Sequence, residues 1–314
     1  MLPNLVITGF PKCGTTSLFT WLADHPQVTG STVKETNFFV DPGTHSFRSH
    51  ANFRDHGLAG YKAYFPESSS GKIIIEATPQ YAYQATALAE IPELSTNPSL
   101  IFVIRNPADQ ILSLYTYYKG NFNFFDPSIS FAEFLKLAEQ KDVRLSRNEL
   151  LLNALQYCDY ELYLDKWRQA VGAERIMVYI FEDIKKNTRA FMKDIASKLG
   201  IDAGFYDEYG FPLENYSYKL KSYKLHQVNI KIRKLLPIPQ RSGLWRALRS
   251  VYRKVNTQPH DKTMPAADRE AFNLLNEHWA TRYSSLVCRY GLFPQAEKGA
   301  ATAVRVGGDL SFSR

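Results

Sequence analysis

The stretch LVITGFPKCGTTSLFTWL, residues 5–22, decides the fold class of this 314-residue chain. Its first six residues form an apolar run typical of a buried strand, and its last eight have the pattern of a helix. Gly9 and Gly14 lie in the turn between the two. A strand, a glycine turn and a helix in this order aim backbone N–H groups and the positive helix end at one point. The stretch therefore predicts an anion-binding loop.

The position of the lysine separates this loop from that of enzymes that hydrolyse nucleoside triphosphates, which reads G-x-x-x-x-G-K-[ST]. Thr15 stands where that lysine is expected, and the lysine of this loop is Lys12. We predict that Lys12 leans over a bound anion. Backbone and hydroxyl groups of the next residues would hold the same anion: Cys13, Gly14, Thr15, Thr16 and Ser17. The alternative is an ordinary strand–helix turn in which a threonine caps the helix.

Four apolar runs rich in Val and Ile alternate with helical patterns along the chain. Each has the composition of a strand that is buried on both faces: 5–10, 72–77, 99–105 and 175–181. Such strands form parallel sheets that helices cover on both sides. We therefore predict an α/β fold with a sheet of the phosphate-loop type and a helical C-terminal elaboration. Gly172 and Gly200 stand where two of the helices would end.

A single domain is expected over residues 1–294, because the chain shows no internal repeat. Residues 205–262 contain no clear strand, so they are interpreted as helices and loops packed over the sheet. Residues 265–290 carry the pattern of one or two amphipathic helices. The small and polar residues 295–314 are expected to form a flexible tail.

Charge is unevenly distributed along the chain, whose formal net charge is +7. Residues 219–254, the basic segment, hold 11 Lys or Arg and no Asp or Glu, which leaves 27 basic and 31 acidic residues elsewhere. A helical or looped segment of this kind attracts an acidic substrate, a phosphorylated nucleotide, a membrane surface or nucleic acid. It can equally be a solvated face with extended lysine and arginine stems. We expect no nucleic-acid partner and keep contact with an anionic surface as one use.

The cysteines indicate the compartment. Cys13, Cys158 and Cys288 cannot all pair, and their spacing gives no cysteine-based zinc site. No apolar run reaches the ~18 residues that span a bilayer. The first residues also lack the pattern of a secretory signal. The sequence therefore predicts a soluble, cytoplasmic protein.

Two motifs carry a resemblance to a known family. GFPKCGTTSL (9–18) resembles the 5′-phosphosulfate loop of sulfotransferases that use 3′-phosphoadenosine 5′-phosphosulfate (PAPS). VIRNPADQILSLYTYY (103–118) resembles their 3′-phosphate motif, in which an arginine at a strand end is followed eight residues later by a serine. Arg105 and Ser113 match that pattern. A guanidinium at a sheet edge is a suitable bidentate partner for a phosphate, and Ser113 lies two helical turns further on the same helix face.

Three further segments resemble the carbohydrate branch, which includes the heparan sulfate sulfotransferases: KETNFF (34–39), EATPQY (76–81) and YELYLDKW…ERIMVYIFEDI (160–184). The likeness extends over about residues 4–200. Because neither a membrane anchor nor a plausible disulfide is visible, the chain resembles soluble bacterial members. The late basic loop that completes the 3′-phosphate site in this branch has no clear match.

The resemblance implies that a sulfuryl group moves from PAPS to a hydroxyl or amine of a glycan or small metabolite. 3′-Phosphoadenosine 5′-phosphate (PAP) is the other product, and no metal is required. Lys12 would neutralise the charge that grows on the bridging oxygen. Glu35, in the segment that holds the catalytic glutamate of the carbohydrate branch, would take the acceptor proton. Its neighbour Lys34 would orient it, lower its pKa or touch the sulfo group.

Other interpretations remain open at this point. A histidine is the rival base, as in the branch that acts on phenols and steroids, and the loop-rich stretch after Glu35 offers three: His45, His50 and His56. Glu76 would orient Lys34 or the acceptor, or only brace a loop. Two other classes compete with the sulfotransferase: a P-loop kinase, and a non-catalytic anion-binding protein that uses the basic segment. The lysine position and the lack of an acidic Mg²⁺ ligand disfavour the kinase.

Overall fold

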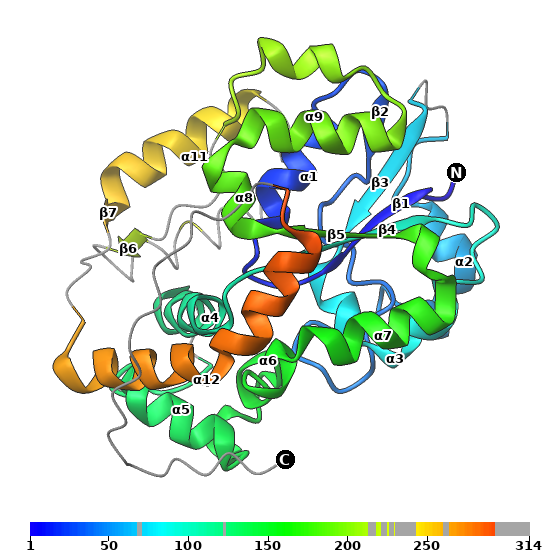
Figure 1. Ribbon diagram of the computed structural model, residues 1–314. Helices are drawn as coiled ribbons and strands as arrows, with labels where there is room; N and C mark the ends of the chain where they lie inside the picture. Colours follow the sequence, from blue (N-terminus) through cyan, green and yellow to red (C-terminus); the bar gives the residue numbers. More distant parts are fainter. Residues whose placement is uncertain are drawn as a thin grey trace.

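The central element of the molecule is a five-stranded parallel sheet with the strand order β2-β3-β1-β4-β5. The computed structural model describes residues 1–67, 71–121, 124–212, 218–220, 225, 229, 243–259 and 264–292. The strands are β1 Leu5–Gly9, β2 Val28–Gly30, β3 Ile73–Ala77, β4 Ser99–Ile104 and β5 Ile176–Ile180. The predicted α/β fold with a parallel sheet is thus confirmed (Figure 1).

Helices cover both faces of this sheet. On one side lie α1 Thr15–Ala23, α8 Phe181–Lys186 and α9 Thr188–Leu199, and on the other lie α3 Ala85–Glu90 and α7 Tyr160–Val171 (Figure 1). Gly172 and Gly200 end α7 and α9, as predicted. The remaining short helices are α2 Phe53–Lys62, η1 Pro79–Tyr83, η2 Val143–Leu145, η3 Gln156–Cys158, η4 Ala173–Arg175 and η5 Ala203–Asp207.

The strand order explains where the site lies. β1 is the first strand of the chain, and the later strands add on both of its sides, with β3 on one side and β4 on the other. All five residues of β1 are buried, which suits a strand with helices on both faces. Where connections leave a parallel sheet in opposite directions, a crevice forms at the carboxyl ends of the strands. The loop that follows β1 lies at this edge of the sheet.

A second hydrophobic core lies beyond the carboxyl ends of the strands. It is built by α4 Pro107–Asn121, α5 Phe131–Glu139, α6 Glu149–Leu152 and α12 Ala266–Tyr290. Phe131, Phe134 and Trp279 are among its buried side chains. The helical C-terminal elaboration is confirmed, and residues 265–290 form one continuous helix that packs on α4 and α5 (Figure 1).

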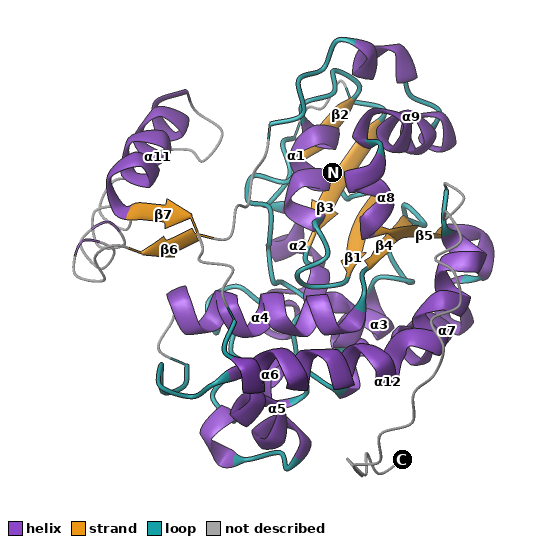
Figure 2. Ribbon diagram, turned by 60° about the vertical axis from the view of Figure 1, so that its left-hand side comes forward, coloured by secondary structure: helices purple, strands orange, loops and turns teal. Residues whose placement is uncertain are grey.

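The interpretation of residues 205–262 as free of strands was wrong. β6 Tyr218–Leu220 and β7 Thr257–Pro259 form an antiparallel pair, and α11 Gly243–Asn256 runs directly into β7. Figure 2 shows these elements to one side of the five-stranded sheet rather than over it. Strands of three residues are too short to carry a periodic signal, and the same reason explains why β2 was missed. The predicted tail, 295–314, lies outside the described residues.

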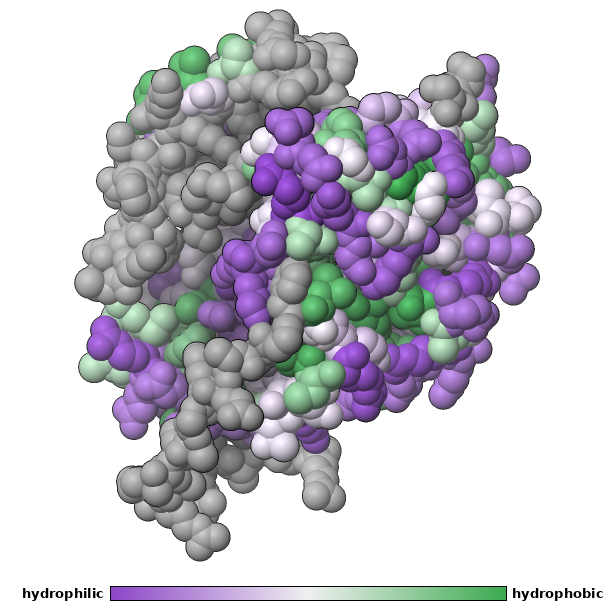
Figure 3. All heavy atoms as spheres, turned by 45° about the horizontal axis from the view of Figure 1, so that its top comes forward, coloured by the Kyte–Doolittle hydropathy of each residue, from purple (hydrophilic) through white to green (hydrophobic). Residues whose placement is uncertain are grey.

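Three side observations bear on the sequence predictions. Cys13 and Cys158 are buried, Cys288 is exposed, and all three are free thiols. In the part of the chain that the structure describes, no helix is both long and apolar enough to cross a membrane. Hydrophilic side chains cover much of the described surface in the view of Figure 3.

Candidate active site

Residues 9–14, the phosphate loop, connect β1 to α1. Gly14 is the N-cap of α1 and has left-handed backbone geometry with φ 84°, and the helix begins at Thr15 as predicted. A β-carbon on Gly14 would come within 2.7 Å of the Phe181 ring, so glycine meets both a conformational and a steric need here. Because no side chain caps the helix, the alternative of a threonine cap is wrong.

The Lys12 side chain lies among the other charged groups of the site. Its ammonium nitrogen lies 3.8 Å from the centre of the Tyr117 ring. Burial lowers the pKa of Lys12 to about 8; the Glu35 charge opposes this shift, and the Arg105 and Lys34 charges add to it. Four ionisable groups from three separate segments therefore act on one another at this point. Such clusters of perturbed groups are typical of functional sites.

Arg105 follows β4 and reaches back to the phosphate loop. Its Nη1 donates a hydrogen bond of 3.2 Å to the backbone oxygen of Lys12, and its guanidinium carbon lies 4.7 Å from the centre of the Phe181 ring. The Arg105 Nε atom is buried without a hydrogen-bond partner. A buried donor without an acceptor is costly. A phosphate oxygen beside Arg105 would remove that cost, so the residues present fit a phosphorylated ligand.

The other residues that were predicted to bind the phosphorylated ligand lie as follows. Thr15 is buried, and Thr16 and Ser17 are partly buried in the first turn of α1. The Cys13 thiol is buried; its Sγ lies 3.6 Å from the Pro11 oxygen, and burial raises its pKa well above the usual range. Ser113 is partly buried on α4. Within the described chain no hydrogen bond joins Ser113 to Arg105, so their shared role stays a prediction.

Residues 34–39, the glutamate segment, run beside the end of β3. Lys34 Nζ and Glu35 Oε1 form an ion pair at 2.5 Å, with 48% of the Glu35 side chain exposed and 15% of the Lys34 side chain. The Ala77 amide donates to the Lys34 carbonyl at 3.3 Å. Phe38 and Phe39 are buried in the main core and anchor the segment. Glu35 is thus a solvent-facing carboxylate on a fixed support.

The Glu76 carboxylate on β3 holds the glutamate segment in place through hydrogen bonds. Its Oε1 accepts hydrogen bonds from the Thr78 hydroxyl at 2.5 Å, the Thr36 hydroxyl at 3.1 Å and the Thr36 amide at 3.4 Å. The Tyr81 hydroxyl accepts from the Phe38 amide at 2.9 Å and lies 3.0 Å from the Thr36 hydroxyl. Glu76 is fully buried, and burial raises its pKa to about 7. Of its three predicted roles, the contacts match the brace of a loop.

A family model described as a sulfotransferase domain matches residues 2–273 of the chain. This chain belongs to the sulfotransferase family. The resemblance that the two nucleotide motifs carried is confirmed.

The chain is similar to parts of two human proteins. The chain is 36% identical to heparan sulfate glucosamine 3-O-sulfotransferase 3B1 over 115 residues, which is 37% of this chain and 26% of that protein. It is 24% identical to bifunctional heparan sulfate N-deacetylase/N-sulfotransferase 2 over 208 residues, 64% of this chain and 22% of that protein. The sulfotransferase chain therefore matches about a quarter of the length of these relatives.

A solved structure confirms the fold. The sulfotransferase of Alicyclobacillus acidocaldarius aligns with a TM-score of 0.57 and 21% sequence identity, over 69% of this chain and 87% of that chain. At that identity the likeness concerns the arrangement of sheet and helices.

The histidines of this sulfotransferase are placed differently from Glu35. His45 uses both ring nitrogens: Nδ1 lies 2.8 Å from Glu149 Oε2, and Nε2 lies 3.0 Å from the Tyr118 hydroxyl. His50 and His56 are exposed. Taking an acceptor proton at His45 would break one of its two bonds, whereas the Glu35 carboxylate is open to solvent. Glu35, and none of the three histidines, is among the groups whose charge shifts the Lys12 pKa; which group takes the acceptor proton stays a prediction.

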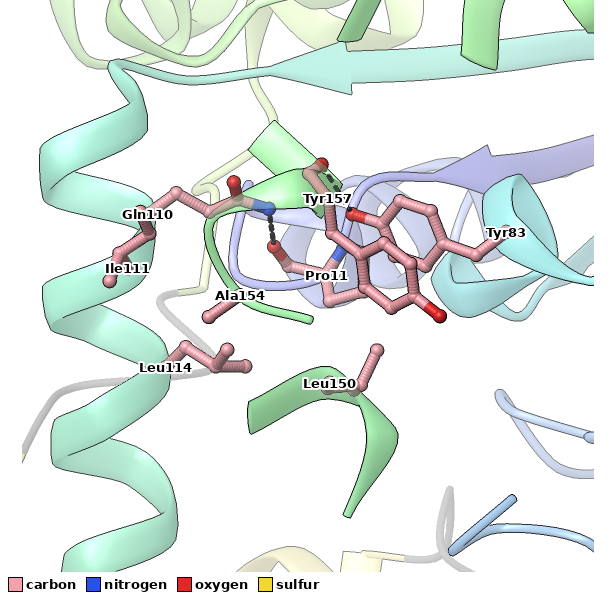
Figure 4. Close-up of a pocket in the computed structure, with 8 residues that line it drawn as sticks. All are labelled: Pro11, Tyr83, Gln110, Ile111, Leu114, Leu150, Ala154 and Tyr157. Atoms are coloured by element: carbon pink, nitrogen blue, oxygen red, sulfur yellow. Dashed lines mark hydrogen bonds between the residues drawn. The ribbon is translucent and has the colours of Figure 1, made fainter. Parts of the chain in front are cut away.

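A shallow hollow lies beside the phosphate loop. It has about 230 Å³ of space between protein atoms, part of it open to solvent, next to Pro11 and the stacked rings of Tyr83 and Tyr157, whose centres are 3.8 Å apart (Figure 4). Gln110 points across it and donates a hydrogen bond of 2.8 Å to the Pro11 oxygen (Figure 4). Its mostly apolar lining from α4, α6 and η1 suits packing of the loop rather than an anion.

Four neighbours of the charged residues were missed from the sequence. Phe181 was counted as the last residue of a strand, but it begins α8 and covers both Gly14 and Arg105. Tyr117 lay within the quoted YTYY stretch without a role. The roles of Thr36 and Tyr81 depend on contacts between residues that are 40 and 45 positions apart in the sequence. Only the aromatic richness of the motif at 103–118 offered a signal for any of them.

Proposed function

We propose that this sulfotransferase moves a sulfuryl group from PAPS to a hydroxyl or amine of a carbohydrate acceptor. The observation that carries the proposal is the convergence of Lys12, Arg105 and Glu35 at the carboxyl ends of β1 and β4. The two human relatives act on heparan sulfate by name, which supports a carbohydrate over other acceptors. A small metabolite is the alternative acceptor.

The donor would be held from both ends. Lys12 and the residues that follow it in the phosphate loop and α1 would take the 5′-phosphosulfate: Cys13, Gly14, Thr15, Thr16 and Ser17. Arg105 and Ser113 would take the 3′-phosphate, with the orphaned Nε of Arg105 as one donor. When bound, PAPS supplies a sulfuryl group with a phosphate as its leaving group.

Three side chains of this chain would act on the reacting atoms. Glu35 accepts the proton of the attacking hydroxyl or amine, for which its half-exposed carboxylate is accessible. Lys34 fixes the Glu35 carboxylate through the 2.5 Å ion pair. Lys12 stabilises the negative charge on the oxygen that leaves sulfur. The new bond joins acceptor and sulfur, the sulfur–oxygen bond of the leaving phosphate breaks, and its electron pair stays on that oxygen.

Two finer predictions belong to this proposal. We predict that the donor binds without a metal; in the described ranges, no three His, Cys, Asp or Glu side chains form a group suited to a metal ion. The cytoplasmic location remains a prediction that rests on the cysteine content.

Calorimetric titration tests the proposed function against the kinase alternative. We expect PAP to bind tightly in buffer with EDTA and in buffer with Mg²⁺, and ATP to bind much more weakly in both. ATP binding that is tighter than PAP binding and requires Mg²⁺ would identify a P-loop kinase instead. A screen with ³⁵S-labelled PAPS over glycans, phenols and lipids would then identify the acceptor; labelled phenols without labelled glycans would contradict the carbohydrate assignment.

A further inference from the structure

Helix α11, Gly243–Asn256, exposes apolar side chains within the most basic part of the sequence. Leu248, Val251 and Val255 are 50%, 60% and 58% exposed. Large aliphatic side chains in a row on a surface helix commonly mark an interaction site, because each would gain free energy if it were covered. None of the three belongs to the two hydrophobic cores.

The sequence of α11 separates its apolar and basic positions by helix face. With about 100° between successive residues, Leu248, Val251 and Val255 share one face, and Leu244 extends it toward the start of the helix. Three arginine positions, 246, 249 and 253, fall on the opposite half with the same three- and four-residue spacing. The helix is therefore divided into an apolar face and a cationic face along its whole length.

Within the described part of the chain, Leu248, Val251 and Val255 of α11 stay exposed. The helix contacts β7, and the buried Asn256 at its end donates a 3.0 Å hydrogen bond from Nδ2 to the Tyr252 hydroxyl. Figure 2 shows α11, β6 and β7 as a separate projection beside the sheet. Figure 3 shows hydrophobic atoms at the upper left edge of the molecule, where Figure 1 places α11.

Charge and hydropathy together select the kind of partner. The basic segment holds 11 Lys or Arg and no Asp or Glu, which excludes a cationic surface and favours an anionic one. Nucleic acids and acidic glycans would use the arginines but leave Leu248, Val251 and Val255 in water. A bilayer with anionic headgroups can bind both faces, because its acyl boundary would bury the apolar row and its phosphates would bind the arginines.

We propose that α11 is a membrane-surface helix that lies in the headgroup region of an anionic bilayer, with the apolar row inserted and the basic row against the lipid phosphates. This function is independent of the proposed sulfuryl transfer. It places the candidate active site beside a membrane, and an interfacial helix of this kind associates reversibly and in a salt-dependent manner.

Vesicle flotation of the full chain tests the proposal. We expect flotation with vesicles of about 30% phosphatidylserine in phosphatidylcholine and none with pure phosphatidylcholine. Leu248→Ser/Val251→Ser should weaken binding about tenfold or more, and Arg246→Gln/Arg249→Gln/Arg253→Gln should do the same. The matched apolar control is Leu162→Ser, which alters a 42% exposed leucine on α7. The matched charge control changes the exposed Lys62, Lys136 and Arg147 to Gln.

Tryptophan fluorescence distinguishes insertion from charge contact alone. Three of the four tryptophans, Trp21, Trp167 and Trp279, are at most 7% exposed, so only Trp245 of α11 is suited to report on the bilayer. Brominated acyl chains should quench the wild-type protein and leave Trp245→Phe unaffected. Thermal unfolding and PAP affinity of every variant should equal those of the wild type, which separates loss of docking from loss of fold.

Three results would overturn the proposal. Vesicle binding that survives the double serine change, without quenching, would show a purely electrostatic contact. Absence of flotation with strong binding to DNA or heparin would identify a polyanion as the partner. Concentration-dependent dimerisation that the double serine change abolishes would show that a second copy of the chain covers the apolar row.

Discussion

The phosphate loop and the glutamate segment hold the charges of the candidate site in different ways. The phosphate loop takes its conformation partly from its own backbone, with Gly14 in the left-handed region and the Cys13 amide bonded to the Phe10 oxygen at 3.3 Å. Arg105 and Gln110 also hold it through hydrogen bonds to the Lys12 and Pro11 oxygens. The glutamate segment takes its shape from side chains about 40 residues away, Glu76 and Tyr81 above all. The phosphate loop therefore combines local and distant contacts, whereas the glutamate segment depends mainly on distant ones.

Glu35→Gln, which changes the glutamate segment, should have the largest effect on the transfer rate. Gln keeps the shape but cannot take a proton, so we expect the transfer rate to fall about 10²- to 10⁴-fold. PAP affinity should stay within about twofold, since the carboxylate is assigned to the acceptor and not to the donor. The rate is measured with ³⁵S-labelled PAPS and the affinity by calorimetry.

The matched control for that change is Glu133→Gln, because Glu133 is also about half exposed and paired with a cation, Arg144. It should leave both quantities unchanged. Equal losses of rate and PAP affinity in Glu35→Gln would assign Glu35 a structural role.

Lys12→Ala tests the phosphate loop, the other half of the comparison. Removal of one positioned charge at a developing anion typically costs about 10²- to 10³-fold in rate, and we expect that range here. Unlike Glu35→Gln, this change should also weaken PAP binding, because Lys12 is assigned to the donor end. Intact ³⁵S transfer in Lys12→Ala would refute the assigned mechanism; the exposed Lys136 provides the lysine control.

Arg105→Ala should change affinity more than rate. Loss of a charged hydrogen-bonding partner costs about 1.5–3 kcal/mol, so PAP should bind about 10- to 100-fold more weakly while saturated turnover stays near the wild-type value. Arg105→Lys should restore part of the affinity, since it keeps the charge but loses the planar fork. An unchanged PAP affinity in Arg105→Ala would place the 3′-phosphate elsewhere.

Glu76→Gln should have the smallest effect on the transfer rate. It tests the support of the glutamate segment through its effect on the stability of the fold. Burial raises the folded pKa of Glu76 to about 7, from an ordinary value of 4.5 for a glutamate. The folded state then holds more protons than the unfolded state between these values, so its stability falls as pH rises through that window. The full difference corresponds to about 3 kcal/mol, present below pH 4.5 and lost above pH 7.

Denaturant unfolding at several pH values measures this contribution as the difference between wild type and Glu76→Gln, in which other titrating groups cancel. We expect the variant to gain relative stability as pH rises from 5 to 8. A constant difference over that range would mean that Glu76 titrates near its ordinary pKa.

The same contrast explains what the sequence could predict. The strand, glycine turn and helix at the start of the chain are local, so their positions and the start of α1 at Thr15 were predicted within a residue. The four long strands of the sheet were found because a buried strand reads as a continuous apolar run. Lys12, Arg105 and Glu35 were selected by motif, and the structure brings their charges into one neighbourhood.

The misses share one cause, which is dependence on distant partners. β2, β6 and β7 have three residues each and exist only through their neighbours. The second core joins α4–α6 with α12, helices more than 110 residues apart in sequence, and no periodic pattern within either stretch predicts this packing. The brace at Glu76 needs a threonine 40 residues upstream. In each case the deciding contact lies beyond the window in which sequence patterns are informative.

The lowered pKa of Lys12 has a consequence for the energetics of ligand capture. Near pH 8 about half of the Lys12 amines lack their proton. An anion that settles beside the amine favours its charged form, so each arrival draws protons out of the surrounding medium. The heat released then varies with the ionisation enthalpy of the buffer chosen, and the apparent affinity declines as the solution becomes more alkaline.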